Sequence, residues 1–153
     1  MKIIIIWLNT ILSFLILLTI SSCTEGEDSI IIFPSSPYLG ITRTLEGGPE
    51  PIGEWDETDW LDIPESGVSI FPAYPNPSDS VFNLGFSVNY SQRGFVYLHH
   101  QLTNQLMIVA DDEFLAGRYE IKVNLKDSKF QKGMIRAYFR FGKGISWGDI
   151  FYR

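Results

Sequence analysis

Few side chains of this sequence could bind a metal ion or take part in catalysis, and their spacing limits which of these roles is possible. The only two histidines, His99 and His100, are adjacent within a segment that reads as a strand. Neighbouring strand residues point to opposite faces of a sheet, so this pair cannot chelate one metal ion, and we expect two ordinary strand histidines. Two acidic groups, Asp56-Glu-Thr-Asp59 with Asp62 and Asp111-Asp-Glu113, carry the oxygen ligands that calcium prefers.

Neither acidic group has the spaced ligands and central glycine of an EF-hand loop. We therefore predict a surface turn at Asp111-Asp-Glu113, since turns favour aspartate, and leave weak calcium binding open for the group from Asp56 to Asp62. The chain has no Gly-x-Ser-x-Gly elbow, and Gly142-Lys-Gly144 lacks the flanking pattern and the helix of a phosphate-binding loop. We expect a protein that is not an enzyme, with neither a metal site nor a cofactor.

The single cysteine, Cys23, stands at the end of an apolar run near the N-terminus. Lys2 supplies one positive charge, and a mostly apolar stretch follows from residue 3 to Ile20. A charged start and an apolar stretch are typical of an export signal. The alternative is a transmembrane helix, because this stretch approaches the roughly 20 residues that cross a bilayer. An exported chain with one thiol cannot form an internal disulfide, so Cys23 needs another role.

The segment Ile20-Ser-Ser-Cys23 resembles the lipobox of bacterial lipoproteins. The resemblance implies cleavage between Ser22 and Cys23 and attachment of lipid to Cys23, which makes residues 1–22 a lipoprotein signal peptide. Each buried CH₂ of an acyl chain contributes about 0.8 kcal/mol, so two or three chains hold a protein firmly to a membrane. Thr24 is not the aspartate that retains some lipoproteins at the inner membrane. We therefore expect an outer-membrane location in the cell envelope, with the membrane as a partner.

Charge is unevenly distributed along the remaining chain. Cleavage before Cys23 leaves 131 residues, enough for one ordinary domain. Residues 24–65 hold eleven acidic side chains and one basic one, whereas residues 66–153 hold seven acidic and ten basic ones. This balance excludes nucleic acid as a partner. Prolines and glycines are dense in residues 23–65, so we predict an irregular acidic tether there.

Two features interrupt this tether. The apolar island from Ile30 to Phe33 is a candidate short strand. Trp55 and Trp60 flank the first acidic group, and large aromatic side chains rarely stay in water. We therefore expect the part that carries these two tryptophans to fold back onto the domain.

Alternating apolar and polar residues dominate the chain from Ser80 onward, which is the pattern of strands buried on one face. No window has a sustained apolar repeat at helical spacing. We predict an all-β domain over residues 66–153, an immunoglobulin-like antiparallel β-sandwich of about seven strands preceded by a cleaved signal helix and the tether. The strand-like runs are 82–88, 95–102, 106–110, 119–125, 134–141 and 145–152, and the predicted turns are 92–94, 103–104, 111–117 and 126–133.

A proline-rich motif precedes the first of these runs. Prolines at Pro75 and Pro77 fix two backbone angles, and Asn76 can bond its own backbone, so Tyr74-Pro-Asn-Pro77 should form a rigid corner. The segment from Phe71 to Pro77 resembles the start of the type IX secretion C-terminal sorting domain and of the related hook-capping-protein immunoglobulin-like domain. Further along, the family's P-A-G-x-Y/H-x-V segment resembles Leu115-Ala-Gly117 with the residues that follow. The resemblance covers residues 71–153 and implies the same sandwich fold.

Three functions are compatible with these features. The first is a lipid-anchored envelope lipoprotein whose non-catalytic sandwich contacts other envelope or secretion-machinery proteins. The second is a sorting domain that directs export to the cell surface, as the resemblance implies. The third is a carbohydrate-binding or calcium-binding sandwich, in which Trp55, Trp60 and Trp147 would act as stacking surfaces.

Overall fold

The computed structural model describes residues 40–53 and 55–153, and these form an all-β structure. Seven strands build two antiparallel sheets, which confirms the predicted fold class. The elements are one 3₁₀ turn, η1 (Pro64–Ser66), followed by β1 (Val68–Tyr74), β2 (Val81–Val88), β3 (Gln92–His100), β4 (Leu106–Phe114), β5 (Gly117–Asn124), β6 (Gly133–Phe141) and β7 (Gly144–Tyr152).

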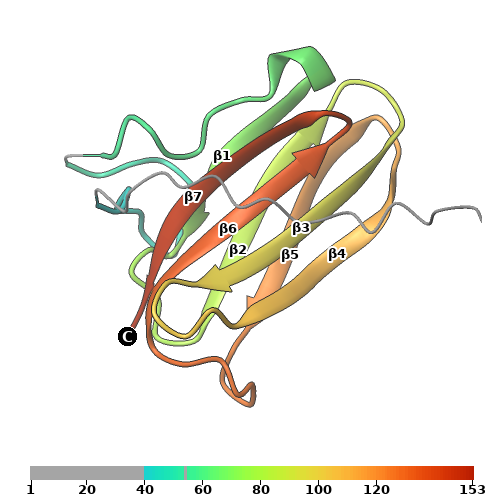
Figure 1. Ribbon diagram of the computed structural model, residues 1–153. Helices are drawn as coiled ribbons and strands as arrows, with labels where there is room; N and C mark the ends of the chain where they lie inside the picture. Colours follow the sequence, from blue (N-terminus) through green and yellow to red (C-terminus); the bar gives the residue numbers. More distant parts are fainter. Residues whose placement is uncertain (1–39, 54) are drawn as a thin grey trace, which may run out of the picture. The chain divides into compact units, whose positions relative to one another are not determined.

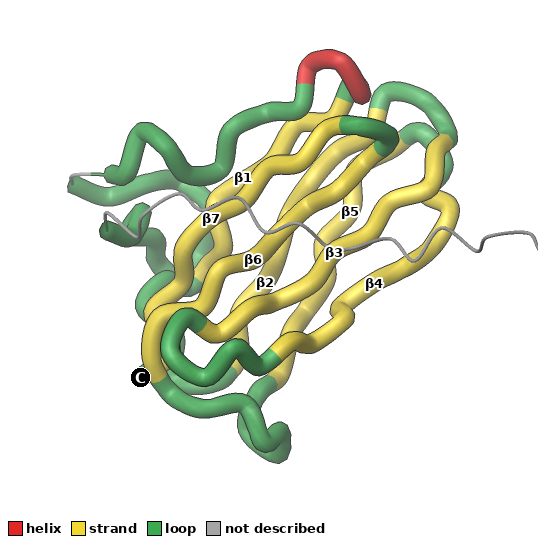
Figure 2. The backbone as a smooth tube through the Cα atoms, in the orientation of Figure 1, coloured by secondary structure: helices red, strands yellow, loops and turns green. Residues whose placement is uncertain are grey.

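The two sheets face each other as an immunoglobulin-like β-sandwich (Figures 1 and 2). The three-stranded sheet has the order β1-β2-β5, and the four-stranded sheet has the order β4-β3-β6-β7. All strand pairs within the sheets are antiparallel. Short hairpins join β3 to β4 and β6 to β7, whereas the links from β2 to β3, from β4 to β5 and from β5 to β6 cross from one sheet to the other.

The period-two pattern places the core between the sheets. Phe82, Leu84 and Phe86 of β2 have no exposed surface, while the intervening Asn83 is only half-buried. Strand β6 contributes its alternate residues from the opposite sheet in the same way. Each fully buried large apolar side chain stabilises a fold by roughly 1.5–3 kcal/mol, so this interdigitated layer is the main source of stability.

Two predicted turns are wrong, and both belong to strands. Gln92-Arg-Gly94 opens β3, where a Cβ built on Gly94 would lie 2.2 Å from Cε1 of Phe141. Gly94 therefore serves close packing of a ring and not a change of direction. Asp111-Asp-Glu113 continues β4, because this strand lies at the edge of its sheet and leaves those side chains in water. The turn between β4 and β5 shrinks to Leu115 and Ala116.

The other two predicted turns agree with the structure. The link from β3 to β4 includes Thr103 and Asn104, and Asn104 has a φ of 55°, the left-handed conformation that asparagine tolerates. Residues 126–133 connect β5 to β6 almost as expected. Strand β1 lies outside the predicted strand-like runs and contains Pro72. It lies at a sheet edge, where the missing N–H of a proline is tolerated, and its pairing with β2 is irregular between Phe71 and Tyr74.

The described part of the predicted tether packs on the sandwich. Its backbone is irregular, as expected, but the described residues belong to one compact unit. The Trp60 N–H donates to the Trp147 carbonyl at 2.7 Å, and the Ser146 hydroxyl donates to the Leu61 carbonyl. Residues 59–63 thus cover the outer edge of β7, which would otherwise offer its unpaired backbone to another chain.

The signal segment 1–22, Cys23 and the apolar island from Ile30 to Phe33 lie outside the described residues. Within the described residues, no helix is both long and apolar enough to cross a membrane.

Candidate functional site

The corner Tyr74-Pro-Asn-Pro77 links β1 to β2, and Asn76 is its centre. Asn76 is fully buried, and its side-chain amide bonds to two distant segments. The amide nitrogen donates to the carbonyls of Thr42 at 2.9 Å and Asp149 at 2.8 Å, and the amide oxygen accepts from the Phe151 N–H at 3.0 Å. The expectation that Asn76 bonds its own backbone is therefore wrong.

An asparagine suits this position because its amide offers two donors and one acceptor on a short stem. Its donors satisfy carbonyls on both sides, one in residues 42–44 and one in β7. The segment is fixed further by Thr44, whose N–H donates to the Asn76 carbonyl at 3.0 Å and whose hydroxyl donates to the Ala73 carbonyl at 2.7 Å. The corner thus joins the N-terminal segment of the described chain to the last strand.

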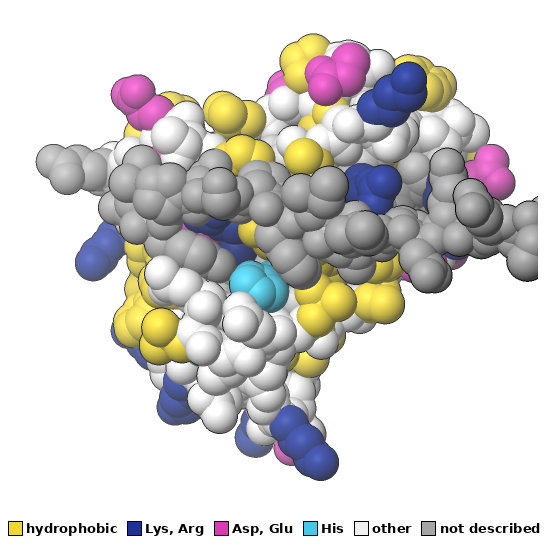
Figure 3. Space-filling model, in the orientation of Figure 1, with side chains coloured by type: hydrophobic (Ala, Val, Ile, Leu, Met, Phe, Trp, Pro, Cys, Tyr) yellow, Lys and Arg dark blue, Asp and Glu magenta, His cyan; other side chains and the backbone are white. Residues whose placement is uncertain are grey.

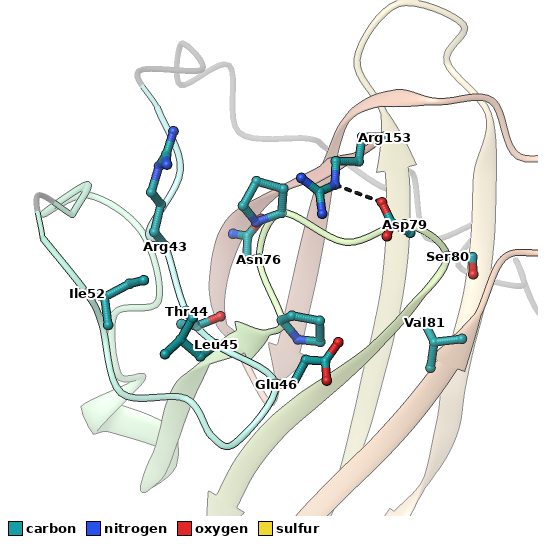
Figure 4. Close-up of a pocket in the computed structure, with 12 residues that line it drawn as sticks. Arg43, Thr44, Leu45, Glu46, Ile52, Asn76, Asp79, Ser80, Val81 and Arg153 are labelled. Atoms are coloured by element: carbon teal, nitrogen blue, oxygen red, sulfur yellow. Dashed lines mark hydrogen bonds and ion pairs between the residues drawn. The ribbon is translucent and has the colours of Figure 1, made fainter.

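A hollow of about 450 Å³ opens beside this corner (Figure 4). One wall is formed by residues between Arg43 and Ile52, and another by the corner, the residues that lead into β2, and Arg153 after β7. Its rim carries acidic and basic side chains. Arg153 Nε lies 2.7 Å from Asp79 Oδ1, while Arg43 and Glu46 have no ion-pair partner among residues 40–53 and 55–153. The lining residues are Arg43, Thr44, Leu45, Glu46, Ile52, Pro75, Asn76, Pro77, Asp79, Ser80, Val81 and Arg153.

The lining of the hollow offers two solvent-facing carboxylates, Glu46 and Asp79, and the hydroxyls of Thr44 and Ser80, of which the Thr44 hydroxyl donates to the Ala73 carbonyl. Leu45 and Ile52 are 61% and 42% exposed, so apolar surface stands beside the charges. A mixed surface of this kind is typical of contact with another polypeptide. The motif residues Tyr74, Pro75, Asn76 and Pro77 are therefore brought together, as one structural corner that forms part of the wall.

A buried charged cluster lies on β6 and β7. Arg136 Nε donates to Asp149 Oδ1 at 2.6 Å and Arg136 Nη2 to Asp149 Oδ2 at 2.8 Å, a bidentate pair between side chains that are 1% and 0% exposed. The guanidinium carbon also lies 5.6 Å from the centre of the Trp147 ring. The two residues are direct cross-strand neighbours in the β6–β7 hairpin. Sequence reasoning missed this pair, and the hairpin register is the signal that could have found it.

Asp59, from the predicted acidic group, extends this cluster. Its Oδ2 accepts the Asp149 N–H at 2.9 Å, while its buried Oδ1 has no hydrogen-bond partner among the described residues. Burial away from water, and then the nearby Asp149 carboxylate, raise the pKa of Asp59 from 3.8 to about 7. Burial also raises the pKa of Asp149, against the opposing effect of Arg136. Asp59 is thus part of the packed structure and not a solvated ligand.

The two histidines point to opposite faces of β3, as predicted. The inner His100 is buried: its Nε2 lies 3.2 Å from the Lys132 carbonyl oxygen, and its Nδ1 accepts the Leu102 N–H at 3.2 Å. It therefore holds the turn that follows β3. His99 is half-buried on the outer face, and burial lowers its pKa. Within residues 40–53 and 55–153, no three His, Cys, Asp or Glu side chains gather as a metal site would require.

The described tryptophans differ in burial, since Trp60 is buried, Trp147 is half-buried and Trp55 is exposed. Trp60 is 6% exposed and packs edge-on against Phe139 at a ring distance of 6.3 Å, so its predicted return to the domain is confirmed. Trp55 is 58% exposed, so the same prediction is wrong for it. Trp60 is part of the core, so its ring cannot be a stacking surface for a sugar.

No protein-family model, curated protein or solved structure matches this chain. Its residues and their geometry are therefore the basis on which a function can be proposed.

Proposed function

We propose that this protein is a lipid-anchored lipoprotein of the bacterial outer membrane whose β-sandwich acts without catalysis, by contact with other envelope proteins. The observation that carries the proposal is the sequence Ile20-Ser-Ser-Cys23 at the end of an apolar run, followed by a chain whose described part folds as one sandwich. The lipid on Cys23 would hold the sandwich at the membrane, and the surface of the sandwich would bind other envelope proteins.

The arrangement of polar groups supports a role without catalysis. The buried side chains of Arg136 and Asp149 form an ion pair with each other. The side-chain amide of Asn76 forms hydrogen bonds with three backbone groups. The two histidines stand on opposite faces, and His100 is occupied by backbone groups. These polar side chains stabilise the fold, which leaves the outer surfaces as the places where a partner can act.

Attachment of lipid can be tested on the chain expressed in a bacterial host. The wild-type protein is expected to incorporate labelled fatty acid and to sediment with membranes, and Cys23→Ala to do neither. Thr24→Ala, the neighbouring residue, serves as the matched control and should behave as wild type. Unchanged partitioning of Cys23→Ala would reject the lipid anchor.

Location at the outer membrane is tested separately. Density separation of inner and outer membranes should place the wild-type chain with the outer membrane, and added protease on intact cells reports whether it faces outward. Recovery of the lipid-modified chain with the inner membrane alone would reject the location while leaving the lipid anchor intact.

A second candidate is a sorting domain recognised by the type IX secretion machinery. It is favoured by the corner at Tyr74-Pro-Asn-Pro77, which leads into β2 and whose Asn76 is buried, because the resemblance implies a motif of this kind before the first long strand. Because Thr42, Thr44 and Trp60 are buried in the fold, a reporter fusion should carry residues 37–153 and not 66–153 alone. Retention of that reporter in the periplasm of a host with a working system would reject this candidate.

A further inference from the structure

Strand β4 is an open edge of the four-stranded sheet. Among residues 40–53 and 55–153, the order β4-β3-β6-β7 leaves one side of β4 without a neighbouring strand, whereas residues 59–63 bond to β7 at the opposite edge. An open edge presents backbone N–H and C=O groups in a row, ready to pair with another extended chain. All nine residues of β4 therefore lie along an edge that no other described strand covers.

The outward row of β4 has two halves of different character. Leu106 and Ile108 pair with His99 and Tyr97 of β3, and Asp111 and Glu113 pair with Phe95 and Arg93. Since these β3 residues alternate with the core residues Val96 and Leu98, their partners all lie on the outer face. The row is thus apolar at its start and acidic at its end.

Both halves are open to water. Leu106 is 42% and Ile108 58% exposed, and Leu102 in the adjoining turn is 82% exposed. Figure 3 shows hydrophobic side chains (yellow) at the surface on the side where β4 lies in Figure 1. In the acidic half, Asp111 bonds Arg93 at 2.9 Å, whereas Asp112 and Glu113 have no ion-pair partner within the part of the chain that the structure describes.

We propose that β4 is the docking edge for an extended segment of a partner protein that carries Lys or Arg residues followed by alternate apolar residues. Antiparallel addition would set the basic residues beside Asp111 and Glu113 and the apolar ones beside Ile108 and Leu106. Backbone hydrogen bonds would supply affinity, and this order of charge and apolar surface would supply selectivity. The inference deepens the proposed contact role by naming the surface and the chemistry of its partner.

A second copy of this chain fits the edge less well. Two copies of β4 related by a two-fold axis at Ile108 would pair only the apolar residues, and their acidic halves would extend past the contact with no basic side chain opposite. The register shift between Val96 and Tyr97 places the extra residue Val109 in β4, so both copies would carry that irregularity inside a short contact.

A designed nine-residue probe tests this edge. The peptide Thr-Lys-Thr-Lys-Thr-Thr-Ile-Thr-Ile, run antiparallel to β4, places its lysines beside the acidic half and its isoleucines beside the apolar half. A control peptide replaces both lysines with glutamates. Binding to the full-length chain in detergent micelles is measured by fluorescence anisotropy of the labelled peptides, and the contact is located by amide chemical-shift changes. We expect the glutamate peptide to bind at least about tenfold more weakly, because it sets like charges together.

Two variants and one matched control locate the site on the chain. Ile108→Lys puts a charge into the apolar half and should weaken binding of the lysine peptide by at least about tenfold. Glu113→Gln removes one unpaired carboxylate and should weaken it by about twofold to fourfold, with the effect lost at high salt. Leu115→Lys alters an equally exposed leucine in the turn after β4 and should leave binding unchanged.

Each result decides for or against the edge. Equal binding of the two peptides, shift changes away from β3 and β4, or unchanged binding by Ile108→Lys would overturn the proposal. Light scattering that finds a dimer of the wild type and a monomer of Ile108→Lys would assign the edge to a second copy instead. If Ile108→Lys does not fold, the test rests on the binding of the lysine and glutamate peptides to Glu113→Gln. Binding of the lysine peptide by Glu113→Gln as tight as by the wild type would then overturn the proposal. None of these results depends on lipid at Cys23, so failure here and failure of the membrane anchor are distinguishable.

Discussion

Replacing Asp59 with asparagine should remove a pH-dependent weakness of the fold. The Asp59 carboxyl is 6% exposed, accepts one backbone N–H from Asp149 and has one oxygen without a partner among the described residues. The charged groups near it are Asp149 and Asp56, which disfavour its ionisation, and Arg136, which favours it. Asparagine has almost the same shape, can accept the same N–H and never ionises.

The sign and size of the effect follow from the pKa of Asp59, which is 3.8 in a solvated chain and about 7 in the fold. Between these values the folded protein keeps a proton that the unfolded chain has lost, so the free energy of unfolding falls as pH rises. Each pH unit in this interval costs about 1.4 kcal/mol, so the loss is complete just above pH 7 and totals about 4 kcal/mol. Below pH 3.8 the group contributes no pH dependence.

Urea unfolding followed by tryptophan fluorescence at a series of pH values measures this effect, because Trp60 and Trp147 border the cluster. Near pH 4 the variant Asp59→Asn should match the wild type within about 1 kcal/mol. By pH 8.5 it should be more stable than the wild type by about 4 kcal/mol. Subtracting the two curves cancels every group that the substitution leaves unaltered.

Asp127→Asn is the matched control, because Asp127 is an exposed carboxyl in the loop between β5 and β6. Its curve should run parallel to that of the wild type across the whole range. If the difference between Asp59→Asn and wild type stayed constant from pH 4 to 8.5, the Asp59 carboxyl would have an ordinary pKa, and its assignment to the buried cluster would be refuted.

Three further changes should destabilise the fold by amounts that urea unfolding can measure. Asn76→Ala leaves buried backbone groups on two segments unpaired and should cost about 3 kcal/mol. Gly94→Ala sets a methyl group 2.2 Å from the Phe141 ring and should cost about 2–3 kcal/mol. Arg136→Leu leaves the Asp149 carboxylate buried without its partner and should cost about 3–5 kcal/mol, with a second change of Asp149→Leu restoring most of it.

Matched controls separate these causes from general disturbance. Gly47→Ala adds a methyl group that meets nothing within 4 Å, so it should leave stability unchanged. Arg93→Leu breaks an exposed ion pair and should cost at most about 1 kcal/mol. A loss in Arg136→Leu no greater than that in Arg93→Leu would contradict the buried pair, and full stability of Asn76→Ala would contradict the role of the corner.

Most of the sheet framework could be predicted because it depends on neighbours in sequence. Strand β2 alternates so regularly that burial of Phe82, Leu84 and Phe86 follows from period alone. The predicted turns were less reliable, because glycine and acidic residues occur both in turns and in strands. Gly94 marks close packing under a ring, and the acidic residues of β4 mark an open edge, although both read as turns in the linear sequence.

The candidate site could not be predicted, because its contacts join residues far apart in the chain. Asn76 bonds Thr42 and Asp149, which lie 34 and 73 residues away. Local reasoning therefore assigned its amide to the nearest backbone. Likewise, Asp59 meets Asp149 across 90 residues, and only the folded sandwich shows that an acidic side chain of the apparent linker is withdrawn from water.

The contacts at Asn76 also set the mechanical behaviour of the protein. Thr42 and Thr44 bond to Asn76 of the corner, Thr44 also bonds to Ala73 of β1, and the corner in turn bonds to β7, so tension entering at residue 40 is divided over both sheets. A protein pulled from the side of its N-terminus would then resist until this group of bonds yields together. Single-molecule extension should accordingly find one early rupture, and Asn76→Ala should lower its force.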